Sequence, residues 1–253
     1  MERKLLCFFL IVARLLGNDF DQCGSLNSDS DSLFEISGTG DEDDITAPWL
    51  AAIGKYESEN NRDGFIVDCS GSIITRRHIV TAAHCFTEIG TKKEKDFPNV
   101  VRVGANRIDS RFSEDRKIKN FKKHPKYEFP KFYLDIALVF LEEELTFSSR
   151  ISPICLPQTI MTHPGAGASI SVQGWGKEEE SSFGKRVSQA NVGIRSKAEC
   201  DYKFRNAGSP SPCDRVTRLM PQLTEDILFC ADGNLNTEIG TCRGDSGGPA
   251  VQK

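Results

Sequence analysis

From residue 36 onward the chain is a succession of short apolar and β-branched runs separated by residues that favour turns. Runs of this length and spacing predict an all-β fold, either a sandwich or a barrel. We expect strands at residues 49–53, 71–75, 78–81, 100–103, 136–141, 170–173, 187–194 and 227–231. One helix is expected after Ser196, because Ser196 and Glu199 have the spacing of a capping box. A chain of 253 residues is long enough for one large domain or two lobes.

The N-terminus indicates export. A charged start precedes an apolar run from Leu5 to Ala13 that is too short to cross a bilayer as a helix. We interpret residues 1–17 as a secretory signal, with a buried N-terminal helix as the alternative. Residues 18–35 are polar and resemble a short propeptide, and no later run is long and apolar enough to cross a membrane.

Composition is consistent with a secreted protein. Nine cysteines suit an oxidising, extracellular compartment. The net charge is only −4 and the two signs are interspersed, so nucleic acid is not an expected partner.

Three segments carry the candidate chemistry, and each also has a purely structural explanation. Taken alone, His84 before Cys85 is better explained as a core histidine beside a disulfide. Asp135 opens an apolar run, and a carboxylate drawn inward is costly unless a donor such as a histidine N–H pairs with it. Residues 244–249, Gly-Asp-Ser-Gly-Gly-Pro, taken alone predict a surface turn.

Together the three segments supply the parts of an activated serine nucleophile. Serine needs a base within hydrogen-bond reach and a third group that holds the tautomer of that base. His84, Asp135 and Ser246 provide these roles once each. Backbone N–H groups approach a developing oxyanion where no Cβ intervenes, so the N–H groups of Gly244 and Ser246 are the candidate oxyanion hole.

Three motifs, in sequence order, resemble those of the trypsin and chymotrypsin family of serine peptidases: Thr81-Ala-Ala-His-Cys85, Asp135-Ile-Ala-Leu138 and Gly244-Asp-Ser-Gly-Gly-Pro249. The resemblance runs from about Ile36 to the last residue and implies a peptidase domain over 36–253. It implies that His84 is the general base and then acid, Asp135 its orienting partner and Ser246 the acyl-forming nucleophile. It also implies two antiparallel six-stranded barrels with the site in the cleft between them.

The resemblance implies three disulfides, which are Cys69–Cys85, Cys200–Cys230 and Cys23–Cys155. The last would hold the propeptide-like segment to the catalytic domain after cleavage. Cys242 pairs in the family with a cysteine beyond the end of this chain, and Cys213 has no counterpart. A Cys213–Cys242 bridge, free thiols and an intermolecular link all stay open.

Activation by the family mechanism would cut before Ile36, so that the new ammonium pairs with Asp245. Residue 35 is Glu where a basic residue would ordinarily mark the cut, so either the activator cleaves after acidic residues or activation is unusual. By resemblance, Gly240 beside Thr241 forms the floor of the primary specificity pocket. Without a carboxylate there, we expect preference for an apolar side chain rather than Lys or Arg.

No metal or cofactor is expected, because Ala105 stands where calcium-binding members carry a carboxylate. The family pattern continues past Lys253 through further strands and a terminal helix. We therefore expect an incomplete second barrel, poor folding and little turnover for the chain as written.

Three functions are compared. The first is a monomeric, secreted endopeptidase whose partners are a protein or peptide substrate and an activating protease or inhibitor. The second is a non-catalytic homologue that binds or regulates other proteins, favoured by Glu35, Cys213 and the early end of the chain. The third, a purely structural extracellular module, leaves the triad unexplained.

Overall fold

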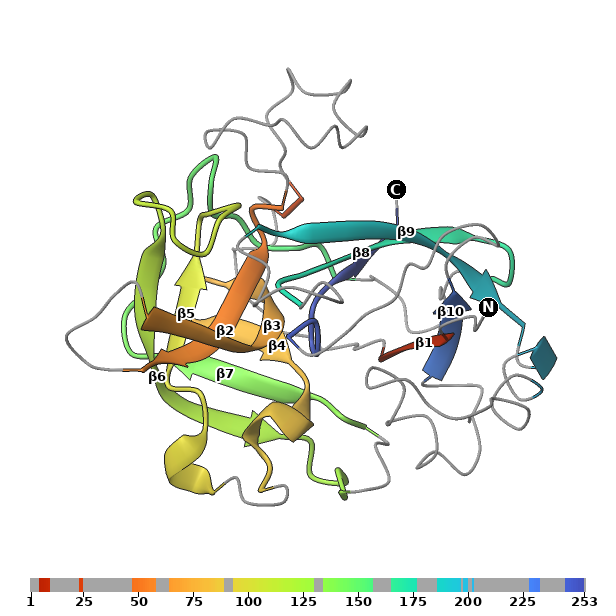
Figure 1. Ribbon diagram of the computed structural model, residues 1–253, viewed down its shortest axis with the longest axis horizontal. Coiled ribbons are helices and arrows are strands. Elements are labelled where there is room, and N and C mark those ends of the chain that lie inside the picture. Colours follow the sequence, from red (N-terminus) through yellow and green to blue (C-terminus); the bar gives the residue numbers. More distant parts are fainter. Residues whose placement is uncertain are drawn as a thin grey trace.

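A closed barrel of six antiparallel strands forms the first half of the protein (Figure 1). The computed structural model describes residues 5–9, 23–24, 47–57, 64–88, 93–129, 134–156, 165–176, 186–196, 198–199, 202, 228–232 and 244–252. The barrel strands are β2 (Leu50–Tyr56), β3 (Phe65–Thr75), β4 (His78–Thr81), β5 (Val100–Val103), β6 (Glu114–Lys123) and β7 (Ala137–Leu141). Their order around the barrel is β2-β3-β4-β7-β6-β5.

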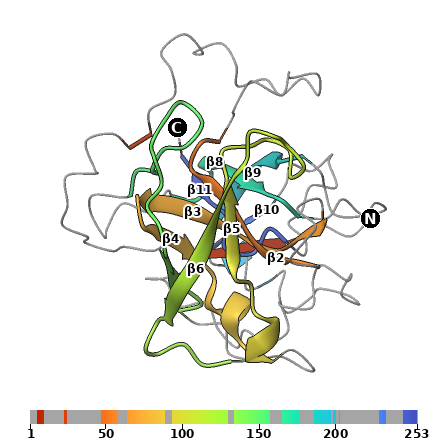
Figure 2. The same cartoon turned by 90° about the vertical axis from the view of Figure 1, so that its left-hand side faces the viewer.

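A second, open sheet lies beside the barrel, and Figure 2 shows it behind β5 and β6. Its strands are β1 (Leu5–Phe9), β8 (Ser169–Gly174), β9 (Ser188–Arg195), β10 (Leu228–Asp232) and β11 (Ala250–Val251). They are hydrogen-bonded in the order β1-β10-β9-β8-β11. The expected all-β class with a closed six-stranded barrel is thus confirmed, and the described strands of the second half form an open sheet.

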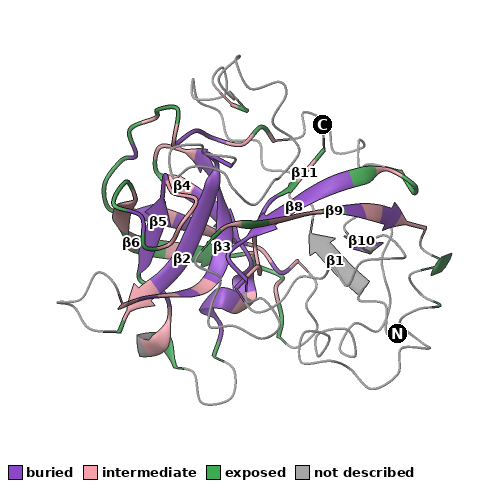
Figure 3. Ribbon diagram, turned by 45° about the horizontal axis from the view of Figure 1, so that its top comes forward, coloured by how far each residue is buried: buried purple, intermediate pink, exposed green. Residues whose placement is uncertain are grey.

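The barrel interior is filled by alternate residues of its strands. Along β7, the side chains of Ala137, Val139 and Leu141 are buried while the residues between them are half-buried. This period of two is what a strand requires when one of its faces packs on a core. The residues coloured as buried in Figure 3 lie mainly along the barrel strands and continue along β8.

Two tryptophans join the barrel to the second sheet. Trp49 and Trp175 belong to one buried cluster, and each is at most 4% exposed. The indole N–H of Trp49 donates to Oε1 of Gln173 in β8 at 2.9 Å. A buried indole stabilises a packed position when its N–H finds an acceptor, so this bond fixes β2 against β8.

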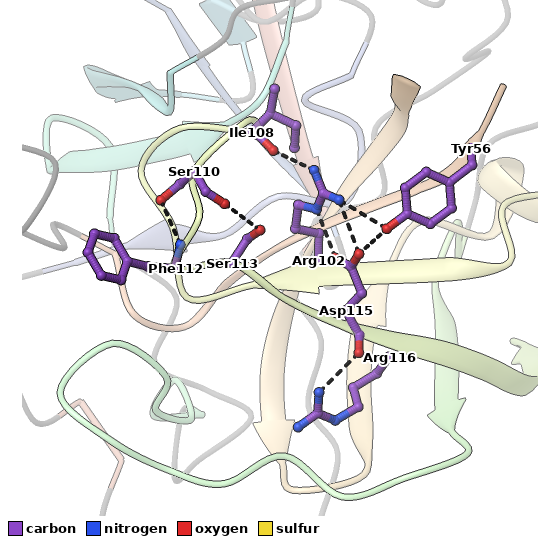
Figure 4. A network of polar contacts seen from close by, with 8 residues as sticks. All are labelled: Tyr56, Arg102, Ile108, Ser110, Phe112, Ser113, Asp115 and Arg116. Atoms are coloured by element: carbon purple, nitrogen blue, oxygen red, sulfur yellow. Dashed lines mark hydrogen bonds and ion pairs between the residues drawn. The ribbon is translucent and has the colours of Figure 1, made fainter. Parts of the chain in front are cut away.

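Arg102 in β5 is a buried charge in the barrel wall, and its contacts are shown in Figure 4. Its Nε donates to Asp115 in β6 at 2.8 Å, and its two terminal nitrogens donate to the Ile108 carbonyl at 2.5 Å and to the Tyr56 hydroxyl at 3.0 Å. The Tyr56 hydroxyl in turn donates to Asp115. Burial acts to lower the pKa of Arg102, but the bonds to Asp115 raise it above its ordinary value, so the guanidinium stays charged.

The N-terminal run forms a strand rather than the helix that was the alternative to a signal. β1 pairs antiparallel with β10, from Leu5 opposite Asp232 to Phe9 opposite Leu228. This pairing belongs to the uncleaved chain, since β1 lies inside the predicted signal at residues 1–17. Whether that signal is removed stays a prediction.

Every predicted run overlaps an observed strand, and β4 and β5 match their predicted bounds. The prediction missed β1, β6, β11 and the first half of β3. Within the described residues, helical structure is confined to the 3₁₀ turns η3 (Ala83–Phe86) and η4 (Glu94–Asp96) and to residues 64, 198–199 and 202. None of the helices in this part of the chain has the length and apolar character needed to span a bilayer.

Candidate active site

The register between β4 and β7 brings His84 and Asp135 to one end of the barrel. These antiparallel strands place Thr81 opposite Ala137. His84 follows Thr81 by three residues in η3, and Asp135 precedes Ala137 by two. Residues that follow one strand and precede its antiparallel neighbour emerge at the same edge of a sheet.

The two side chains form a short hydrogen bond. Nδ1 of His84 lies 2.6 Å from Oδ2 of Asp135, and the backbone N–H of His84 donates to Oδ1 at 2.7 Å. Asp135 is only 2% exposed, so these bonds satisfy a carboxylate that has lost its water. Because an ionised carboxylate only accepts hydrogen bonds, the proton of a neutral His84 ring lies on Nδ1, and Nε2 carries the lone pair that a base would need. The His84 side chain keeps 26% of its surface exposed.

A disulfide holds the segment that carries His84. Cys85 is bonded to Cys69 in β3, the pairing that the resemblance implied. The sulfurs of these two cysteines and a ring nitrogen of His84 lie within 4.8 Å of one another. This group does not suit a metal ion, because the disulfide leaves no thiolate to coordinate it.

The loop at residues 244–249 packs against the chain just before His84. Gly247 has φ +80°, and a Cβ placed on it would lie 2.2 Å from Oγ1 of Thr81 and 2.5 Å from the backbone nitrogen of Ala82. The carbonyl of Ser246 accepts the N–H of Ser70 in β3 at 2.9 Å. The loop that carries Ser246 is therefore fixed beside the histidine segment, and only glycine fits at position 247.

Asp245 points at the segment that follows β8. Its Oδ1 accepts the backbone N–H of Gly176 at 2.6 Å. A Cβ on Gly174 would lie 2.2 Å from the carboxylate, and one on Gly176 would lie 2.1 Å from it. The sequence Gly-Trp-Gly at residues 174–176 thus leaves room for this carboxylate.

Several predicted residues fall outside the part of the chain that the structure describes. They are Ile36, Cys200, Cys213, Gly240, Thr241 and Cys242, together with the side chain of Cys230. The pocket floor, the Cys200–Cys230 pair and the new N-terminus therefore stay predictions. The third implied disulfide, Cys23–Cys155, is present and spans 132 residues of sequence.

Sequence reasoning missed one buried polar residue of the site, Ser70. Its hydroxyl contacts both Gly244 and Trp175. β3 also contains Asp68, Ser72 and Thr75, so a serine at position 70 gives no distinctive signal, and its partners are distant in sequence.

Residues 36–253 match the family model described as Trypsin. The chain is 31% identical over 212 residues to Limulus clotting factor C of Carcinoscorpius rotundicauda, covering 81% of this chain and 19% of that protein. It is 31% identical to CLIP domain-containing serine protease B4 of Anopheles gambiae, covering 81% and 55% of the two chains. It is 32% identical to Trypsin delta of Drosophila erecta, covering 81% and 68%.

The chain thus spans a fifth to about half of the length of two of these relatives. Among solved structures, neuropsin, a serine protease expressed in the limbic system of mouse brain, superposes with a TM-score of 0.61. It shares 24% identity over 83% of this chain and 80% of its own, which supports the fold. From the family match over residues 36–253 and the similarity to Trypsin delta, of which this chain covers 68%, the chain belongs to the trypsin family of serine proteases.

Proposed function

We propose that this protein is a secreted serine endopeptidase that cleaves peptide bonds through His84, Asp135 and Ser246. The observation that carries the proposal is the buried Asp135 carboxylate, which is bonded to both the ring and the backbone of His84. Such a carboxylate costs stability unless it is paired, and this pairing also sets the tautomer that a general base needs.

In the proposed reaction, Nε2 of His84 takes the hydroxyl proton of Ser246 as Oγ attacks the substrate carbonyl carbon. The C–N bond then breaks, and His84 returns the proton to the leaving amine. Water repeats the sequence on the acyl-enzyme and releases the acid, restoring the Ser246 hydroxyl. The N–H groups of Gly244 and Ser246 donate to the oxyanion in both steps.

The test is covalent labelling of the chain by a fluorophosphonate probe after activation. We expect the folded, processed fraction of wild type to be labelled, however small that fraction is, and Ser246→Ala and His84→Ala to lose labelling. Ser171→Ala is the matched control, because Ser171 is a buried serine in β8 with no bond to the triad. Labelling that survives Ser246→Ala, or a folded wild type that is never labelled, would refute the proposal.

We further propose that cleavage before Ile36 activates the protein and that the new ammonium binds Asp245. Support comes from Asp245, whose carboxylate already lies in the recess between Gly174 and Gly176. The activating protease would cut this chain after Glu35. N-terminal sequencing of the active protein tests this, and any start other than Ile36 contradicts it.

Primary specificity is proposed to be for an apolar residue, because Gly240 and Thr241 bring no carboxylate to the pocket floor. The substrates are proposed to be extracellular proteins. Profiling cleavage of a peptide library by the activated, unlabelled protein tests the preference, and cleavage after Lys or Arg would contradict it.

A non-catalytic binding homologue is the second candidate, favoured by Glu35 at the activation position. The labelling experiment separates the two: a folded chain processed at Ile36 but never labelled is what this candidate predicts.

A further inference from the structure

Ser70, in the middle of β3, has no exposed surface, and its hydroxyl and both of its backbone polar groups are engaged. Its backbone N–H donates to the carbonyl of Ser246 at 2.9 Å, and its carbonyl accepts the hydroxyl of Thr81 at 2.7 Å. Its hydroxyl donates to the carbonyl of Gly244 at 2.8 Å and accepts the backbone N–H of Trp175 at 3.2 Å.

The hydroxyl therefore bridges three separate parts of the molecule. Ser70 belongs to the barrel, Trp175 follows β8 of the second sheet, and Gly244 opens the loop that carries Ser246. No regular strand pairing supplies these two bonds, because neither Gly244 nor Trp175 lies in a strand. The Ser70 side chain supplies the hydrogen bonds that connect these segments, a role that backbone groups play between paired strands.

Gly244 needs such a contact because glycine does not fix its own conformation. Its φ is +107°, and glycine exchanges readily between regions of positive and negative φ. The position of its N–H depends on which region it occupies. Anchoring its carbonyl limits the rotation of the residue and holds the N–H in one direction.

We propose that Ser70 is a positioning residue for the oxyanion hole, acting through the carbonyl of Gly244. The proposal rests on the proposed peptidase function and deepens it. Ser70 makes its hydrogen bonds with backbone groups of the protein and with the Thr81 hydroxyl, so Ser70 holds the loop rather than the substrate. Its loss should weaken binding of the transition state and leave ground-state binding of substrate unchanged.

The test compares Ser70→Ala with wild type by steady-state kinetics on one peptide ester or amide. Removing an oxyanion donor outright lowers kcat by about 10²–10³-fold, so loosening one should lower kcat by roughly tenfold or more, with KM unchanged. The inhibition constant of a peptide boronic acid, which forms a tetrahedral adduct on serine, should rise by a similar factor.

Ser72→Ala is the matched control, since Ser72 is a buried serine two residues further along the same strand. It should keep the wild-type kcat and boronate affinity. Ser70→Gly is a second variant that also lacks the hydroxyl and should repeat the loss. Rates are divided by the concentration of active sites titrated with a fluorophosphonate, so that unfolded protein does not lower the measured kcat.

Two results would overturn the role of Ser70. One is a wild-type kcat per titrated site in both Ser70 variants, and the other is a rise in KM with boronate affinity unchanged. A wild type that is folded and processed but never labelled is a different outcome, because it removes the proposed peptidase function and the role of Ser70 with it.

Discussion

Position 176 requires glycine because of a single carboxylate. A Cβ there would lie 2.1 Å from Oδ2 of Asp245, closer than any real contact. We predict that Gly176→Ala displaces Asp245, destabilises the fold by about 1–3 kcal/mol and abolishes labelling of Ser246. Gly165→Ala is the control, since nothing lies within 4 Å of a Cβ at that position. Urea denaturation measures both, and equal stability of the two variants would contradict the prediction.

Tyr127, which lies near Asp135, makes the stability of the protein depend on pH. Burial and the nearby Asp135 carboxylate raise the pKa of Tyr127 to about 12, so its phenol stays protonated while an unfolded tyrosine ionises near pH 10. A raised pKa in the folded state contributes stability that is lost as pH rises above the unfolded value.

We therefore predict that wild type loses stability relative to Tyr127→Phe between pH 9 and pH 11. After allowance for partial solvent exposure, the relative change should be about 1 kcal/mol. Chemical denaturation of both proteins at the two pH values measures it. A difference between the proteins that does not change with pH would show that Asp135 and burial leave Tyr127 unperturbed.

The candidate triad was readable from sequence because each member lies in a short motif. The cost of burying a carboxylate predicts that Asp135 pairs with a histidine N–H. In the structure Nδ1 of His84 lies 2.6 Å from Oδ2 of Asp135. Ser70 was not readable. Its hydroxyl contacts residues 105 and 174 positions away, and no local pattern encodes such a bond.

Among the elements, the strands with apolar alternation were found and β6 was missed. Seven of the ten residues of β6 are charged, and Ile118 and Phe121 are its only apolar ones. A strand made mostly of charged residues shows no alternation of apolar and polar residues by which the sequence would reveal it. Its extended backbone is held by hydrogen bonds to β5 and β7.

The capping box depends on residues close together in sequence, and the sequence predicts it correctly. The Ser196 backbone N–H donates to Glu199 at 2.9 Å, and the Glu199 N–H donates to the Ser196 hydroxyl at 3.3 Å.

The β5–β6 pair depends on Arg102. Replacing it with methionine leaves Asp115 facing Tyr56 without its cation, and we predict a loss of about 3 kcal/mol in unfolding free energy. Arg107→Met is the matched control, because the Arg107–Asp109 pair has a similar length of 2.9 Å but side chains 27% and 33% exposed. An exposed pair contributes at most about 1 kcal/mol. Urea denaturation that gives equal losses would contradict the role assigned to burial.

At the scale of the whole molecule, the sequence indicated an all-β protein but not how its two halves meet. The motifs specify a family and hence a barrel, whereas contacts such as Trp49 with Gln173 depend on the folded arrangement. The second sheet also includes β1, which no pattern in the first 17 residues assigned to a strand. Apolar runs of that length are compatible with several structures, and tertiary pairing selects among them.

The Cys23–Cys155 disulfide predicts how the molecule behaves after activation. Because it joins the propeptide-like segment to the body of the domain, that segment should stay attached after cleavage before Ile36. Mass spectrometry should find both pieces together without reductant and separate after reduction. Cys23→Ser should release the segment without reductant. Release from the wild type under non-reducing conditions would contradict the bridge.

The most direct test of the catalytic arrangement is a crystal structure of the activated protein after reaction with a phosphonate. We predict a covalent bond from phosphorus to Oγ of Ser246, a phosphonyl oxygen within hydrogen-bond distance of the N–H groups of Gly244 and Ser246, and a retained bond between His84 and Asp135. A phosphonate on any other residue, or a Ser246 hydroxyl out of reach of His84, would contradict it.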